Sequence, residues 1–224
     1  MLEQLLAFTA ASLVVIVVPG PDMMLLLRNA TRHGRTGALW TAIGIMTGLG
    51  ILASAAALGI TALLTASPTL FDVVRIAGGG YLVYLGAQAL RSYRRLRRRS
   101  GAEAVAGSID LADATGPAAE AVPRRVKVSS FRQGLLCNLL NPKVAAFYLA
   151  LFPQFDLSPL TPLVQHVALA ATFWIFCLAW YVGLVSVITR ITTTLQSPRF
   201  TRRTEAVAGT ALTGLGVLVL TRAG

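Results

Sequence analysis

The sequence predicts an all-α protein that crosses a membrane several times. Of its 224 residues, 55% are hydrophobic and only 13% are charged, whereas soluble domains carry about 25% charged residues. The apolar residues fall into six long runs, most of which reach the roughly 20 helical residues that span a bilayer. These observations exclude a soluble globule, a disordered chain and a disulfide scaffold.

The six apolar runs are expected to be transmembrane helices. The first and fourth contain a proline well inside, where a missing N–H and a ring clash break or kink a helix. A cleaved signal peptide is the alternative for the first run, but its start carries Glu3 and no basic residue. The expected helices cover residues 2–27, 37–64, 70–90, 131–152, 163–188 and 206–220.

The distribution of basic residues predicts how the protein lies in its membrane. A net charge of +11 would suit nucleic-acid binding only if the cations gathered on one face. Instead, 17 of the 20 Lys and Arg lie in the segments that follow the first, third and fifth runs. Because such residues keep short loops cytoplasmic, we expect both termini outside and no nucleic-acid partner.

The chain is expected to form one membrane domain built from two inverted three-helix repeats, residues 1–93 and 131–224. Phe8 precedes Pro19 by eleven residues, as Phe131 precedes Pro142, so a single offset of 123 superposes both pairs. Residues 94–130 are expected to be a flexible, basic, cytoplasmic linker, because they show no period that could bury a face.

The two helix breaks are the candidate site. Freed backbone groups in hydrocarbon persist only where protein buries them or where they line a wet cavity, and matched breaks in two inverted halves indicate the midplane site of a transporter. Half-helices that begin at proline also present free N–H groups to an anion. The candidate substrate- or ion-binding residues are Pro19, Gly20, Pro21, Asp22, Asn138, Asn141, Pro142 and Lys143.

Asp22 and Lys143 are the two charges at these breaks. A charge at the bilayer centre costs at least about 2.5–3.5 kcal/mol, so it usually faces a cavity or a partner. Asp22 could bind an ammonium group, exchange a proton or cap its own helix, and Lys143 could bind a carboxylate. Alternatively, the two charges pair with each other or snorkel to a lipid headgroup, and Asn138 and Asn141 serve only as hydrogen bonds between helices.

Enzymatic motifs are absent from the sequence. It contains no His-Glu-x-x-His, no Gly-x-Ser-x-Gly and no P-loop, and Cys137 and Cys177 lie in apolar runs that suit packing. We therefore expect no enzyme, no cofactor and no metal site. The remaining alternative to a transporter is a non-transporting membrane scaffold or accessory subunit, for which matched helix breaks would be an unneeded cost.

Two sequence signatures resemble the LysE/RhtB family of bacterial amino-acid exporters. The first is Pro-Gly-Pro-Asp at 19–22, followed by Arg-Asn-Ala-Thr-Arg-His-Gly-Arg-Thr-Gly at 28–37 and by Gly44 and Gly48. The second is Phe131-x-x-Gly134-x-x-x-Asn138-x-x-Asn141-Pro142-Lys143, which runs on to Phe147 and to Phe-Pro-Gln-Phe at 152–155.

The resemblance implies a multi-pass exporter of amino acids or close derivatives in the bacterial inner membrane. It also implies coupling to an ion gradient, for which we expect a proton rather than sodium. Rocking of the two halves would expose the central site to each side in turn. Six helices form a small bundle, and its glycine-rich faces offer a surface for a homodimer.

Overall fold

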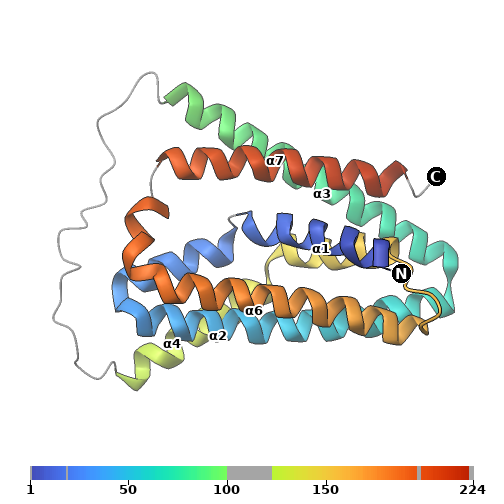
Figure 1. Cartoon of the computed structure of the whole chain (residues 1–224), viewed down its shortest axis with the longest axis horizontal. Helices are drawn as coiled ribbons and strands as arrows, with labels where there is room; N and C mark the ends of the chain where they lie inside the picture. The colour runs from blue at the N-terminus through green and yellow to red at the C-terminus, as the bar shows by residue number, and fades with distance from the viewer. Residues whose placement is uncertain (1, 19, 100–122, 196–197, 222–224) are drawn as a thin grey trace.

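The computed structural model describes residues 2–18, 20–99, 123–195 and 198–221. Within these ranges the protein is helical and contains no strand, which confirms the expected all-α class (Figure 1). Its elements are α1 (Leu2–Val17), α2 (Pro21–Ala66), α3 (Pro68–Arg99), α4 (Arg124–Leu139), α5 (Pro142–Leu151), the short 3₁₀ helix η1 (Phe152–Gln154), α6 (Pro162–Leu195) and α7 (Pro198–Thr221).

Three described helices are long and apolar enough to cross a bilayer. They are α2, residues Thr69–Arg91 of α3 and residues Pro162–Val187 of α6. A fourth candidate is the pair formed by α4 and residues Pro142–Gln154, which is bent by 43° at the break between them. The apolar segments Glu3–Val17 and Leu212–Thr221 are shorter.

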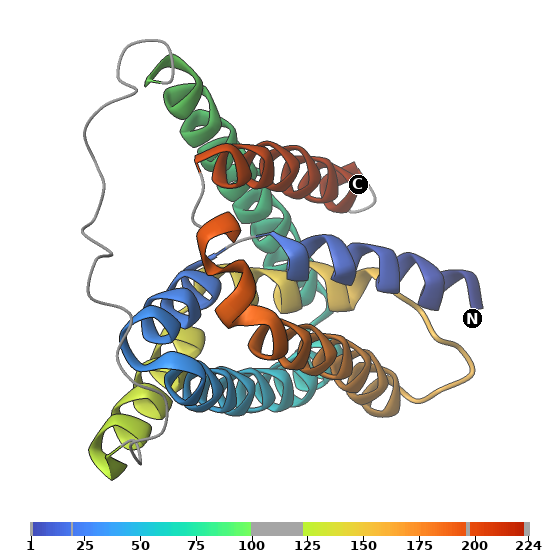
Figure 2. The same ribbon diagram turned by 60° about the vertical axis from the view of Figure 1, so that its left-hand side comes forward.

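Helix α2 consists of two arms that fold back on each other. His33 and Gly34 leave the helical conformation, and Gly34 has a φ of 61°, which favours glycine. The Asn29 amide donates to the Thr41 hydroxyl at 2.8 Å, although twelve residues of straight helix would separate them by about 18 Å. The chain therefore reverses at Gly34, as Figures 1 and 2 show.

Two short gaps interrupt the helices near the expected breaks. Helix α1 ends at Val17 and α2 begins at Pro21, while α4 ends at Leu139 and α5 begins at Pro142. Proline suits a first helical position because its missing N–H would have no partner there. Both gaps therefore lie inside apolar sequence, between a helix C-terminus and a helix N-terminus.

The helices extend beyond the expected apolar runs. Helix α3 continues to Arg99 and α4 begins at Arg124, so both ends of the expected flexible linker, residues 94–99 and 124–130, are helical instead. Arginine is a good helix former, and a hydropathy window does not register that property. The rest of the linker, residues 100–122, lies outside the described residues.

The chain termini and the basic helix ends lie at opposite ends of the molecule. The N-terminal end of α1 and the C-terminal end of α7 lie toward the same end of the molecule (Figure 1). The C-terminal end of α3, the N-terminal end of α4 and the turn in α2 lie at the opposite end. The basic segments that precede and follow the linker are therefore far from both termini.

Aromatic side chains form the core between α1, α5 and α6. Phe8 of α1 lies 6.0 Å from Phe147 and 5.2 Å from Phe155, measured between ring centroids. Phe147 in turn stacks on Phe173 of α6 at 4.1 Å. Such pairs add about 0.5–1.5 kcal/mol each beyond the burial of their area. This cluster fixes α1 and α5, whose ends form the two gaps.

Glycines bring α2 and α4 into backbone contact. A Cβ built on Gly44 would meet the carbonyl oxygen of Phe131, and one built on Gly134 would meet that of Thr41. Small residues permit this close approach of membrane helices.

Alanine at position 44 is therefore expected to destabilise the protein by about 1–3 kcal/mol, as overpacked cores are. Thermal unfolding of detergent-purified Gly44→Ala should show the loss. Gly59→Ala is the matched control, because a Cβ there would meet nothing within 4 Å. Equal melting temperatures for Gly44→Ala and wild type would contradict the packing described here.

Candidate functional site

The two gaps meet at a buried carboxylate. Asp22 lies in the first turn of α2 and is only 6% exposed. Its Oδ2 accepts hydrogen bonds at 2.9 Å from the side-chain amides of both Asn138, at the end of α4, and Asn141, before α5. The structure thus brings together residues more than 115 positions apart, one acid from the first gap and two amides from the second.

Within the described part of the chain, two oxygen atoms at this site have no hydrogen-bond partner among those that the geometry shows. They are Oδ1 of Asp22 and Oδ1 of Asn138, and both are buried. Leaving a buried polar atom unsatisfied costs about 1–3 kcal/mol, more for a charged group. Both atoms are hydrogen-bond acceptors, and the Cys137 thiol of α4 is a weak donor close to the Asp22 carboxylate.

Lys143 follows the second gap in the sequence, but its side chain reaches the α1 side of the first gap, whereas Asp22 lies on the α2 side. Its Nζ donates to the carbonyl oxygens of Val18 at 2.8 Å and Val15 at 3.2 Å. These carbonyls lie at the C-terminal end of α1, where helical acceptors have no partner and the macrodipole is negative. Gly20 makes room for this ammonium group, because a Cβ there would lie 3.1 Å from Nζ.

Asn141 forms hydrogen bonds with both Asp22 and Lys143. Its amide nitrogen donates to Asp22, while its Oδ1 accepts from the backbone N–H of Lys143 at 3.1 Å and so caps α5. Since this cap occupies one free N–H of the half-helix, the N-terminus of α5 has fewer donors left for an anion than the sequence alone indicates.

The structure brings together seven of the eight candidate residues. Pro19 lies outside the described residues, and Pro21 and Pro142 begin α2 and α5. Asp22 and Lys143 are near one another but have separate hydrogen-bond partners, amides for the acid and carbonyls for the amine. The alternative in which the two charges pair directly therefore does not describe this conformation.

Several residues at the site have no clear signal in the sequence. Val15 and Val18 act through backbone carbonyls, which no side-chain motif reports. Gly48 faces Asn138, whose Oδ1 would lie 3.2 Å from an added Cβ; the sequence indicates Gly48 only as part of a family signature and not as a site residue.

The LysE type translocator family model matches residues 13–223, which includes every element of this site. The chain belongs to the LysE type translocator family. Membership confirms the resemblance found in the sequence and makes the chain a membrane transport protein rather than an enzyme.

Several relatives match nearly the whole length of this LysE type translocator. A leucine efflux protein of Klebsiella pneumoniae is 30% identical over 94% of this chain and 89% of its own. A homoserine/homoserine lactone efflux protein of Salmonella typhimurium is 26% identical over 95% and 94%. An uncharacterized membrane protein of Bacillus subtilis, YrhP, is 26% identical over 96% and 98%. No solved structure matches the translocator.

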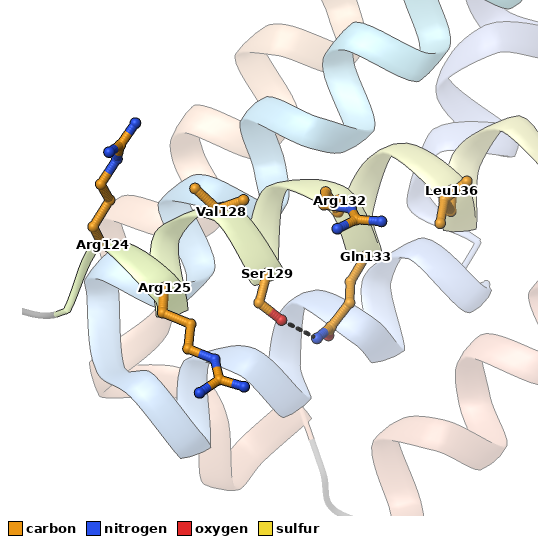
Figure 3. A pocket seen from close by; sticks show the side chains of 7 residues that line it. All are labelled: Arg124, Arg125, Val128, Ser129, Arg132, Gln133 and Leu136. Atoms are coloured by element: carbon orange, nitrogen blue, oxygen red, sulfur yellow. Dashed lines mark hydrogen bonds between the residues drawn. The ribbon is translucent and has the colours of Figure 1, made fainter.

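A hollow of about 610 Å³ lies on the translocator away from the two gaps (Figure 3). All its lining residues belong to α4, so it is an open helix face rather than an enclosed site. Arg124, Arg125 and Arg132 give this face a positive charge. Among the described residues, no group of three or more His, Cys, Asp or Glu side chains could hold a metal ion.

Proposed function

We propose that this translocator exports amino acids or close derivatives across the bacterial inner membrane by alternating access. The observation that carries the proposal is the buried carboxylate of Asp22, one oxygen of which is held by two amides. A buried carboxylate positioned by two amides inside a transporter suits an ammonium group or a proton. The names of the leucine and homoserine efflux relatives support amino acids as the substrate class.

The proposal assigns the two ends of the amino acid to the two gaps. Asp22, with the vacant Oδ1 of Asn138, receives the α-amino group. Lys143 and the start of α5 receive the α-carboxylate in the conformation where Nζ leaves the carbonyls of Val15 and Val18. The spacing between the ammonium and carboxylate groups is the same in all α-amino acids, so these residues would not distinguish one amino acid from another. Other residues would select the side chain of the substrate.

We propose six membrane crossings with both termini outside. In this topology α1 with the short arm of α2 forms one broken crossing, and α4 with α5 forms the matching one in the second half. The long arm of α2, α3, α6 and α7 are the other four. Each half then contains a broken crossing followed by two long helices, and the arginine-rich ends of α3 and α4 face the cytoplasm, as the positive-inside rule requires.

Polar contacts on both sides of the site are the proposed gates. Toward the basic end, the Asn29 amide donates to Gln133 Oε1 of α4 at 3.2 Å. Toward the termini, the Thr61 hydroxyl and Nδ1 of His166 are 2.8 Å apart and join α2 to α6. Alternating access would open one contact while the other stays closed, so that Asp22 never faces both sides together.

Export in proteoliposomes tests this function and its coupling. Efflux of labelled leucine or homoserine is expected to slow several-fold when nigericin collapses the pH gradient, because protonation of Asp22 would compete with the ammonium group. Replacement of sodium by choline should leave the rate unchanged, and protein-free liposomes provide the background. Sodium-dependent efflux would contradict proton coupling, whereas no efflux of any amino acid tested would favour a scaffold or accessory subunit.

A further inference from the structure

A second cavity, of about 450 Å³, lies between the long arm of α2 and α6. Its α2 wall extends from Arg35 to Thr47 and its α6 wall from Trp174 to Ser186. The two helices are antiparallel here, since the Trp174 indole N–H donates to the Met46 carbonyl oxygen at 3.1 Å and Leu184 and Val185 pack against the α2 residues nearer Arg35. Arg35 and Ser186 therefore lie at one end of the cavity and Thr47 and Trp174 at the other.

The cavity is as long as one leaflet of a bilayer. Each wall covers twelve residue steps, which correspond to about 18 Å of helix. Half of the hydrocarbon core of a bilayer is about 15 Å thick. A groove that begins at the basic end of the protein would therefore end near the midplane.

The walls of the cavity are apolar and open to the surroundings. Leu39, Ile43 and Val182 line it and keep 46%, 39% and 58% of their surface exposed. The hydroxyls of Thr47 and Ser186 donate to carbonyl oxygens of their own helices. Apart from the phenol of Tyr181, these walls therefore offer an aliphatic chain mainly apolar surface.

Among the described lining residues, the only charged side chain lies at the end of the cavity nearest the turn in α2. Arg35 follows the turn at Gly34 and is exposed, and no acidic side chain lines the cavity with it. A guanidinium group binds phosphate oxygens bidentately. The cavity thus combines a leaflet-length apolar groove with a phosphate-binding group at its mouth.

We propose that this groove binds an anionic phospholipid of the surrounding leaflet, with an acyl chain between α2 and α6 and its phosphate at Arg35. The site is separate from the two gaps, because none of its described lining residues belongs to either gap. A bound lipid would pack against the α2 and α6 interface that the proposed outer gate also uses.

Quenching of Trp174 fluorescence by brominated lipids tests the site. The probe is the full chain with Trp40→Phe and Trp180→Phe, reconstituted in bilayers that contain phosphatidylglycerol or phosphatidylcholine with identical brominated acyl chains. Phosphatidylglycerol is expected to quench Trp174 at lower mole fraction. Arg35→Gln should reduce this preference about fivefold, the effect of one interfacial cation, and Arg35→Lys, which keeps the charge but not the bidentate geometry, should restore only part of it.

Arg32→Gln is the matched control, because Arg32 is equally exposed near the same turn but does not line the groove. Equal loss of preference in Arg32→Gln and Arg35→Gln would overturn the proposal, as would equal quenching by the two lipids. Displacement of the brominated lipid by leucine would also overturn it and make the groove a substrate route. Each result is independent of export activity, so failure of the lipid site and failure of the proposed function are distinguishable.

Discussion

Asp22→Asn is expected to lower amino-acid export by about 100-fold while the protein remains folded. Asparagine has the same shape and still accepts hydrogen bonds from the amides of Asn138 and Asn141, so the two gaps stay joined. It lacks the charge that would hold an ammonium group or a proton. A charge-assisted hydrogen bond contributes about 1.5–3 kcal/mol, and each 1.4 kcal/mol is about a tenfold effect.

Initial rates of leucine and homoserine efflux from proteoliposomes measure this change. Glu3→Gln is the control, since Glu3 is an exposed acid at the start of α1, away from the site, and should leave the rates unaltered. Wild-type rates in Asp22→Asn, with the same response to nigericin, would show that Asp22 neither binds the amino group nor couples the proton.

Lys143→Met is expected to impair both stability and transport. The thioether chain fills similar space but cannot donate, so the carbonyl oxygens of Val15 and Val18 lose their partner at the end of α1. Unsatisfied buried groups cost about 1–3 kcal/mol each, and each kcal/mol lowers the melting temperature of a chain of this size by roughly 2–4 °C. We expect a melting temperature lower by roughly 5–10 °C.

The other lysine of the chain, Lys127, provides the control, because it lies near the start of α4 beyond the apolar sequence. Lys127→Met should melt within about 2 °C of wild type, as surface substitutions do. If Lys143→Met melts like the control but no longer exports, Lys143 acts on substrate and not on the end of α1. If it melts and exports like the control, both roles assigned to Lys143 are wrong.

The sequence predicts the all-helical class and the neighbourhood of the site because both depend on patterns along the chain. Apolar runs separated by arginine-rich segments predict membrane helices. Proline and charge inside such runs single out Asp22 and Lys143, and the structure places both at the two gaps. That the prolines cause these gaps, and that the halves form an inverted repeat, remain predictions.

Features that depend on contacts between distant segments could not be predicted. The partners of Lys143 are backbone carbonyls, whose availability depends on where α1 ends rather than on residue type. The hydrogen bond between Asn29 and Thr41 requires the chain to reverse at Gly34. The sequence contains 20 glycines, and nothing in it distinguishes Gly34 as the one at which the chain reverses. The boundaries at Arg99 and Arg124 were missed because hydropathy locates the bilayer and not the helix.

The two gaps contribute unlike groups to one site: the first supplies an acid and the carbonyl acceptors for an amine, and the second supplies the amine and two amides. Two copies of either half, placed face to face, would repeat one set of groups and lack the other. Each side of the chain therefore supplies groups that the other lacks, and neither one alone holds all the contacts of the site.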